Sequence, residues 1–152
     1  MSTSALPAFI DALLAASTAA LPDVTVADCW PVSLNSGNWL LIGVDDAEAS
    51  RTIGASGTQV YPHAQRLTRD ESGEVHAVVW CAHDDDDVKG ARDAAFAILA
   101  AVETLLRQSI TLNVASVWKA SVAAWSYTPH RLADYGSTVA EIQFSITYEA
   151  RI

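Results

Sequence analysis

The sequence lacks both a hydrophobic run long enough to cross a membrane and a basic segment at its start. No apolar stretch approaches the roughly 18 residues that a membrane-spanning helix needs. The apolar stretch from Ala5 to Leu14 is preceded by no Lys or Arg, whereas a secretory signal begins with positive charge. We therefore expect a protein without a membrane span or secretion signal, made for the cytoplasm of its cell.

Motifs for catalysis and cofactor binding are missing as well. The sequence has no G-x-S-x-G elbow, no P-loop, no G-x-G-x-x-G fingerprint and no H-E-x-x-H motif. The G-A-S-G segment at 54–57 is too short and isolated to cradle a phosphate, so a flexible loop is expected there. His63, His76, His83 and His130 lie on different predicted elements, without the i, i+4 spacing of a metal pair. We expect no catalytic residue, no cofactor and no metal, and a protein that is not an enzyme.

Basic residues and cysteines are few. Nine basic residues against eighteen acidic ones give a formal charge of -9, and the basic residues are scattered singly. This pattern argues against tight nucleic-acid binding, because phosphate affinity comes from clustered Lys and Arg. Cys29 and Cys81 lie in apolar segments outside any C-x-x-C pair, so we expect both thiols to be reduced and buried.

His83 is followed by four consecutive aspartates, Asp84 to Asp87. A Ca²⁺ or Mg²⁺ site is one interpretation, because hard cations bind several carboxylate oxygens. Consecutive residues at a helix start point in different directions, however, and a calcium loop alternates its ligands. The run is better explained as helix capping, where carboxylates accept from free N–H groups and favour the helix dipole.

Apolar residues are abundant, at 51% of 152 residues, which suits one domain spanning 1–152 with its own core. Helical periodicity occurs from about Ala5 to Ala20, with Ser4 as the expected N-cap, and again from Asp86 to Gln108, with Arg107 in the last turn. The apolar face of the first helix is formed by Leu6, Phe9, Ile10, Leu13 and Leu14. That of the second is formed by Val88, Ala91, Ala95, Ile98, Leu99, Val102, Leu105 and Leu106.

Strand-length segments occupy most of the remaining chain. The strands are predicted at Val24–Cys29, Trp39–Val44, Val60–Leu67, Glu74–Ala82, Ser116–Tyr127 and Gly136–Ile152. Turns or loops are predicted between them at Asn35–Asn38, Asp45–Gln59, Asp70–Gly73 and Thr128–Tyr135. Trp39–Val44 is continuously apolar and Glu74–Ala82 is apolar on both faces, so both are expected in the interior of the sheet.

The last strand alternates without interruption from Glu141 to Ile152. Its apolar set is Ile142, Phe144, Ile146, Tyr148, Ala150 and Ile152, and its polar set is Glu141, Gln143, Ser145, Thr147, Glu149 and Arg151. This period of two is typical of an antiparallel sheet with one covered and one wetter face. We expect an α+β fold, a mostly antiparallel sheet with two amphipathic helices packed on one face. On the wetter face, Glu141→Ala or Glu149→Ala is expected to change folding little.

The chain has five tryptophans, Trp30, Trp39, Trp80, Trp118 and Trp125. Packing in the core or on the sheet explains most of them. The alternative is that one or two of them, in the first place Trp30 and Trp125, anchor a subunit contact, since Trp is enriched at interface hot spots.

Four segments together resemble the tail terminator (minor tail) proteins of long-tailed bacteriophages, especially those that infect actinobacteria. They are the long helix Asp87–Arg107, the strand end Phe144–Ile152, the opening helix Ala5–Leu14 and the segment Leu41–Asp46. The likeness covers most of the chain in element order and length. It includes no catalytic motif, so it transfers no functional residue.

The resemblance implies a virion protein at the head-proximal end of the tail, assembled in the host cytoplasm. Such a protein caps the tail tube as a six-subunit ring, ends tube polymerisation and forms the surface that meets the head. Its partners would be further copies of itself, the tail tube protein and a head-completion or neck protein, with DNA passing through unbound. Six copies would carry a formal charge of 6 × (-9) = -54, and we hypothesise that part of it lines the channel.

A ring closes when one heterologous interface repeats under a rotation, and exposed strand edges are suited to such contacts. The expected subunit or partner interface is formed by Trp125, Thr128, Pro129, His130, Arg131, Tyr135, Asp45, Asp46 and Arg51. Two other interpretations stay open. One is a different phage neck or tail-completion protein, and the other is a small-molecule-binding α+β module with an apolar pocket.

Overall fold

The computed structural model describes residues 3–31, 34, 37–46, 52–62, 68–83, 86–132 and 137–152. Two helices and six strands follow one another along these residues. In chain order they are α1 (Leu6–Ala20), β1 (Thr25–Asp28), β2 (Gly37–Ile42), β3 (Ala55–Val60), β4 (Asp70–His83), α2 (Val88–Gln108), β5 (Val117–Leu132) and β6 (Ser137–Arg151).

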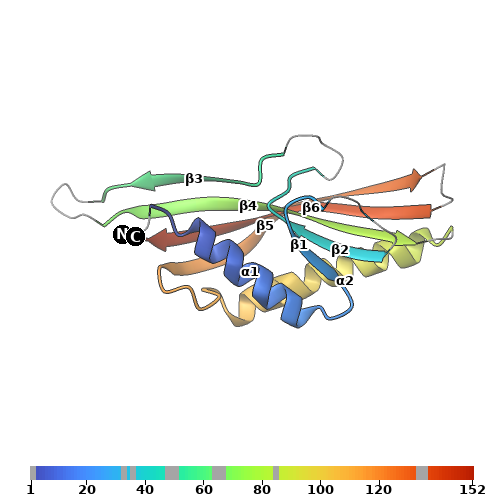
Figure 1. Ribbon diagram of the computed structural model, residues 1–152, viewed down its shortest axis with the longest axis horizontal. Coiled ribbons are helices and arrows are strands. Elements are labelled where there is room, and N and C mark those ends of the chain that lie inside the picture. The colour runs from blue at the N-terminus through green and yellow to red at the C-terminus, as the bar shows by residue number, and fades with distance from the viewer. Residues whose placement is uncertain are drawn as a thin grey trace.

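The six strands form one sheet in the order β1-β2-β4-β6-β5, and β3 also pairs with β4. Strand β1 runs parallel to β2, and every other pairing is antiparallel. Strands β2 and β3 share one edge of β4. Strand β3 pairs with its first part, Asp70–Val75, and β2 pairs with Ala77–Ala82. Figure 1 shows both helices across the same face of the sheet. The predicted α+β class, with two helices on one face of a mostly antiparallel sheet, is confirmed.

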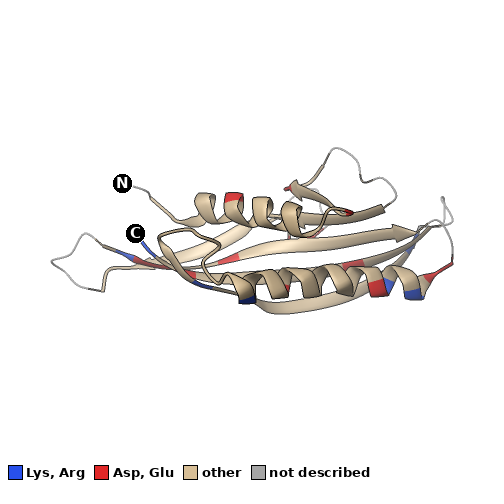
Figure 2. Cartoon of the chain, turned by 90° about the horizontal axis from the view of Figure 1, so that it is seen from below, with Lys and Arg blue, Asp and Glu red and all other residues tan. Residues whose placement is uncertain are grey.

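The core lies between this face and the helices. Strand β6 contributes its alternate apolar residues, so the predicted apolar set from Ile142 to Ala150 is buried. Helix α1 buries Phe9 and Leu13, while α2 buries a stripe that runs from Ala91 to Leu106. The middle of α2 carries no charged residue, and Figure 2 shows its charges near the two ends. Periodicity in the sequence therefore located the core face of all three elements. Only Val88, predicted on this face of α2, is wrong, because it is exposed in the first turn of the helix.

Helix α2 begins as the sequence predicted. The Asp87 carboxylate accepts a hydrogen bond of 2.8 Å from the Gly90 backbone N–H, which caps the helix, and Arg107 lies in the last turn. Asp84 and Asp85 lie outside the described residues. The capping role is thus confirmed for the last aspartate of the run.

Helix α1 is capped differently from the prediction. Its N-cap residue is Ala5 rather than Ser4. The Ser4 hydroxyl does accept a hydrogen bond of 3.0 Å from the Leu6 backbone N–H, but the side chain of Ala5 itself bonds nothing in the first turn. Instead the Glu71 carboxylate of β4 accepts from the Ala5 backbone N–H at 3.0 Å and from the Ser4 hydroxyl at 2.8 Å. The same oxygen accepts from the Tyr148 hydroxyl at 2.8 Å. A carboxylate far away in sequence thus satisfies the Ala5 N–H at the helix start, which no local capping pattern reveals.

The Tyr148 ring occupies space that Gly73 leaves open. A Cβ atom on Gly73 would lie 2.3 Å from a ring carbon of Tyr148, and the ring stacks on Phe9 with centroids 4.9 Å apart. Because Gly73 has no side chain, the Tyr148 ring can lie flat between the sheet and α1.

Gly73→Ala is expected to lower the free energy of unfolding by about 1–3 kcal/mol, because the added methyl displaces a buried ring. Urea denaturation would measure the loss. Gly57→Ala is the matched control, since the nearest atom to its Cβ is 3.3 Å away. Equal losses for the two variants would contradict the steric explanation.

Several predicted connections are strands instead. The predicted turn at Asp70–Gly73 is wrong, because β4 begins at Asp70. The predicted loop at Asp45–Gln59 is wrong in its last part, since Ala55–Val60 forms β3, and the flexible G-A-S-G loop is wrong for the same reason. Pairing with neighbouring strands holds these segments, although their polar residues carry no alternation that marks a strand.

Other predicted strand and loop boundaries also differ from the observed ones. The predicted strand Val60–Leu67 is wrong at its start, where Val60 ends β3, and residues 63–67 lie outside the described chain. The predicted turn Asn35–Asn38 is wrong for Gly37 and Asn38, which begin β2. The predicted loop Thr128–Tyr135 is wrong up to Leu132, which ends β5. Hairpin pairing extends β5 beyond Pro129, because β5 is an edge strand and its Pro disturbs only one ladder position.

The two cysteines differ in environment. Cys81 is buried in the core, and its burial raises the pKa of the thiol to about 12. Cys29 is exposed, so the prediction that both thiols are buried is wrong for Cys29. Its backbone has a φ of 62°, at the end of β1 where the chain turns away from the sheet. Both thiols are free.

Candidate functional site

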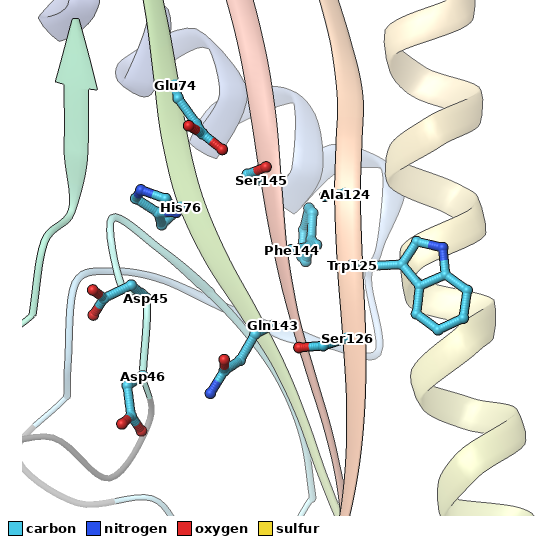
Figure 3. Close-up of a pocket in the computed structure, with 10 residues that line it drawn as sticks. All are labelled: Asp45, Asp46, Glu74, His76, Ala124, Trp125, Ser126, Gln143, Phe144 and Ser145. Carbon is cyan, nitrogen blue, oxygen red and sulfur yellow. The ribbon is translucent and has the colours of Figure 1, made fainter.

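Side chains able to recognise a partner gather on the sheet face opposite the helices. Here a shallow hollow of about 540 Å³ lies over the middle of β4, β5 and β6. Figure 3 shows polar groups converging on it from three strands and from the loop after β2. The hollow is lined by Asp45, Asp46, Glu74, His76, Ala124, Trp125, Ser126, Gln143, Phe144 and Ser145.

The lining of this hollow is acidic. Three carboxylates, those of Asp45, Asp46 and Glu74, lie around His76, and the described lining includes no Lys or Arg. The Thr52 hydroxyl donates to the Asp45 carboxylate and accepts from the Asp45 backbone N–H at 2.8 Å. The hydrogen bond from Thr52 holds the pKa of Asp45 below its ordinary value. This side chain is therefore ionised at neutral pH, and the hollow favours cationic over anionic partners.

Next to the hollow, a polar cluster is buried between β4, β5 and β6. Glu141 is 2% exposed, and His130 Nε2 lies 2.7 Å from its carboxylate. The amide of Gln143 donates to the other oxygen of Glu141 at 2.8 Å. The His130 ring stacks on Trp80 with centroids 6.0 Å apart. The expectation that Glu141 lies on a wetter face is wrong, because these neighbours and the apolar residues beside Trp80 cover it.

Glu141→Ala is therefore expected to lower the free energy of unfolding by about 1–3 kcal/mol, because it leaves His130 and Gln143 without their acceptor. The matched control is Glu149→Ala on the same face of β6, whose side chain is 41% exposed. Exposed ion pairs contribute about 0–1 kcal/mol. Chemical denaturation of both variants would test this, and indistinguishable losses would contradict the role of burial.

The predicted interface residues of β5 occupy different faces of the strand. Trp125 is 54% exposed and packs edge-on against Phe96 of α2, with centroids 5.2 Å apart. Figure 3 shows its indole pointing toward α2, away from the hollow. Thr128 and Pro129 are exposed. Arg131 is exposed too, 3.5 Å from an oxygen of Asp86.

The other predicted interface residues lie elsewhere. His130 belongs to the buried cluster with Glu141, while Asp45 and Asp46 line the hollow. Arg51 and Tyr135 lie outside the described residues. The structure thus brings Asp45 and Asp46 to one hollow, while Trp125 borders it with its indole turned toward α2. It places Thr128, Pro129 and Arg131 farther along β5. The interface role of all nine residues remains a prediction.

Of the two tryptophans expected to anchor a contact, Trp30 is 40% exposed and Trp125 is 54% exposed. Trp80 is buried, as core packing requires. Trp118 is 40% exposed and lies under the guanidinium of Arg151, 5.6 Å from its ring centroid. Sequence reasoning missed Trp118 as an exposed ring, because the residues around it alternate like those of a covered strand.

In the part of the chain that the structure describes, no group of three or more His, Cys, Asp and Glu side chains is arranged to hold a metal ion. Over the same residues, no helix has the length and apolar character needed to cross a membrane.

Comparison with solved structures finds chains of similar fold. No protein-family model matches the chain, and no curated protein sequence matches it either. A solved chain from the "virion of native gene transfer agent (GTA) particle" is similar in structure, with a TM-score of 0.54 and 12% sequence identity. The match covers 98% of this chain and 100% of that chain. At this identity the likeness shows a shared fold.

Proposed function

We propose that this protein is a structural protein of a phage-like virion and that it acts as the tail terminator. The observation that carries the proposal is the end-to-end structural likeness to a chain of the gene transfer agent virion. The sequence resemblance supports the same role, since the helix and strand segments that carry it form α2 and β6. The protein would cap the tail tube as a ring, end its polymerisation and present a surface to the head, without catalysing a reaction.

The geometry suits this role in two respects. Among the described residues the sheet has unpaired strand edges on opposite sides, which is what a repeating head-to-tail contact needs to close a ring. Its uncovered face carries the acidic hollow of Asp45, Asp46 and Glu74. In this proposal that face lines the channel, where negative charge repels DNA phosphates and keeps the passing DNA from sticking.

Deletion of the gene is the direct test. Particles assembled without the protein are expected to carry tails of overlong and variable length, because nothing ends tube growth. Tail lengths would be measured by electron microscopy, with the gene supplied in trans as the control. Tails of normal length that join heads would refute the proposal.

The same likeness also favours a second candidate, another neck or tail-completion protein, because the similar chain comes from a whole virion. A particle reconstruction would separate the two. A terminator forms a ring directly on the last layer of the tail tube, with the carboxylates of Asp45, Asp46 and Glu74 toward the channel. Density for this chain away from the tube end would favour the second candidate, and a neutral or basic channel would contradict the proposed role of charge.

A further inference from the structure

Two strand edges of the sheet carry most of its exposed apolar side chains. Strand β5 has no described neighbour on its outer side, and neither does β3 on the side away from β4. Among the described residues eight large apolar side chains are exposed; three of them belong to these strands, two flank β3 in the chain and one lines a groove beside β5. These six are Ile53, Val60 and Tyr61 around β3, and Ile110, Trp118 and Trp125 around β5. Exposed apolar groups concentrated at free edges indicate an interaction surface.

The outer edge of β5 also has a groove beside it. This groove has a volume of about 350 Å³ and lies between β5 and the C-terminal end of α2. Its β5 side is formed by Lys119, Ala120, Ser121 and Val122. Its helix side is formed by Glu103, Leu106, Arg107 and Ile110. An extended segment along β5 would place its helix-side residues in this groove, as in strand addition.

Irregularities in β5 limit where such a segment can pair. The register with β6 shifts between Val117 and Lys119 and again between Val122 and Ala124. The regular stretch between the two shifts is therefore Lys119–Val122, the same residues that line the groove. Bulges interrupt a hydrogen-bonding ladder and increase local twist. A partner strand for this edge is thus expected to pair over a short stretch of regular backbone.

Strand β3 lies in the same rows of the sheet as Lys119–Val122 and runs in the opposite direction. Following the registers across β4 and β6 places Thr58 in the row of Lys119, Gly57 in that of Ala120, Ser56 in that of Ser121, and Ala55 in that of Val122. The three antiparallel pairings in this path make β3 and β5 run in opposite directions. A second copy moved sideways, without sliding along the strands, would bring its β3 antiparallel against Lys119–Val122.

We propose that the outer edge of β5 at Lys119–Val122 binds β3 of a second copy of this chain. The paired strands continue the sheet from one subunit into the next. The small residues Ala55 and Gly57 of the incoming strand face the groove, and the contact is head-to-tail. This inference rests on the proposed ring and names the surfaces that join its subunits.

Cysteine cross-linking tests the contact in assembled particles. Ser56→Cys and Ser121→Cys place two thiols on the uncovered face in one row, and both positions are exposed. Within one chain they are three strand spacings apart, about 14 Å. A short bismaleimide therefore links them across subunits. Cys29→Ser removes the exposed native thiol in every variant.

Particles with both cysteines are expected to yield a ladder of covalent multimers of this chain on denaturing gels. The matched control pairs Ser56→Cys with Ser126→Cys, which is exposed on the same face of β5 but about 13 Å farther along the strand. The control and each single variant should stay monomeric. Three results would overturn the inference. The double variant enters particles but gives no ladder, the control gives an equal ladder, or the cross-linker joins this chain to another protein. Each of these results leaves the tail-length test of the proposed function unaffected.

Discussion

Glu71→Ala should destabilise this protein more than any other removal of a single polar side chain that we consider. Glu71 is 2% exposed, and its carboxylate accepts hydrogen bonds from Ser4, Ala5, Gln59 and Tyr148. Its loss leaves the Ala5 N–H without its acceptor and removes the carboxylate partner of the Ser4, Gln59 and Tyr148 side chains. Unsatisfied buried donors cost about 1–3 kcal/mol each, so a total loss of roughly 3–5 kcal/mol is expected. Urea denaturation monitored by circular dichroism would measure it.

The pH dependence of stability gives an independent check on Glu71. Burial alone would raise the pKa of this carboxyl, but hydrogen bonds from Gln59, Tyr148, Ser4 and the Ala5 N–H together lower it below its ordinary 4.5. A carboxyl whose pKa is lower in the folded chain than in the unfolded chain stabilises the fold fully above the unfolded value. That contribution is lost as the pH falls through the folded value.

Glu71→Gln supplies the comparison, because glutamine has nearly the same shape and does not ionise. The difference in unfolding free energy between the natural chain and Glu71→Gln should be largest near neutral pH and shrink below about pH 4.5. A difference that stays constant down to acid pH would show that the charge of Glu71 does not stabilise the fold.

Phe144→Ala is expected to cost about 3–5 kcal/mol, because it removes a large ring from a well-packed core. Phe144 is 4% exposed and lies on β6 opposite Ala77 of β4. Its small neighbours cannot refill the space. Thermal or chemical unfolding would measure the loss, with a lowered melting temperature as the accompanying sign.

Trp125→Ala is the matched control for Phe144→Ala. Trp125 pairs with Phe144 in the same row of the sheet and on the same face, but it is 54% exposed. Its removal should cost clearly less, since more than half of its surface stays in water in the folded chain. A loss as large as that of Phe144→Ala would mean that the packing against Phe96 matters more than burial in this row.

Long periodic segments made most of the fold predictable. In α2 the apolar stripe, the Asp87 cap and Arg107 all agree, so the sequence predicted the helix nearly to its ends. In β6 the period of two identified the face that packs against the helices. Both elements bury one face over many residues, and that requirement leaves a strong pattern.

The sequence predicted β3 and the first part of β4 wrongly because these segments follow no such pattern. From Ser56 to Val60 the side chains are exposed, and Asp70–Gly73 has the composition of a turn. Backbone pairing makes them strands, because β3 pairs with β4 and the first part of β4 pairs with both β3 and β6. Backbone hydrogen bonds require no particular side chain, so nothing local marks these residues.

In the candidate site and in the core, one physical reason separates the features that the sequence determined from those that the tertiary structure decided. By itself the sequence determined the fold class, the core face of α2 and β6, and a net charge of -9. Only the tertiary structure decided that Glu71 caps α1, that Glu141 is buried with His130, and that β3 and Lys119–Val122 lie level on opposite edges. Each of these depends on contacts between residues far apart in the chain, and local periodicity carries no record of which distant segments meet.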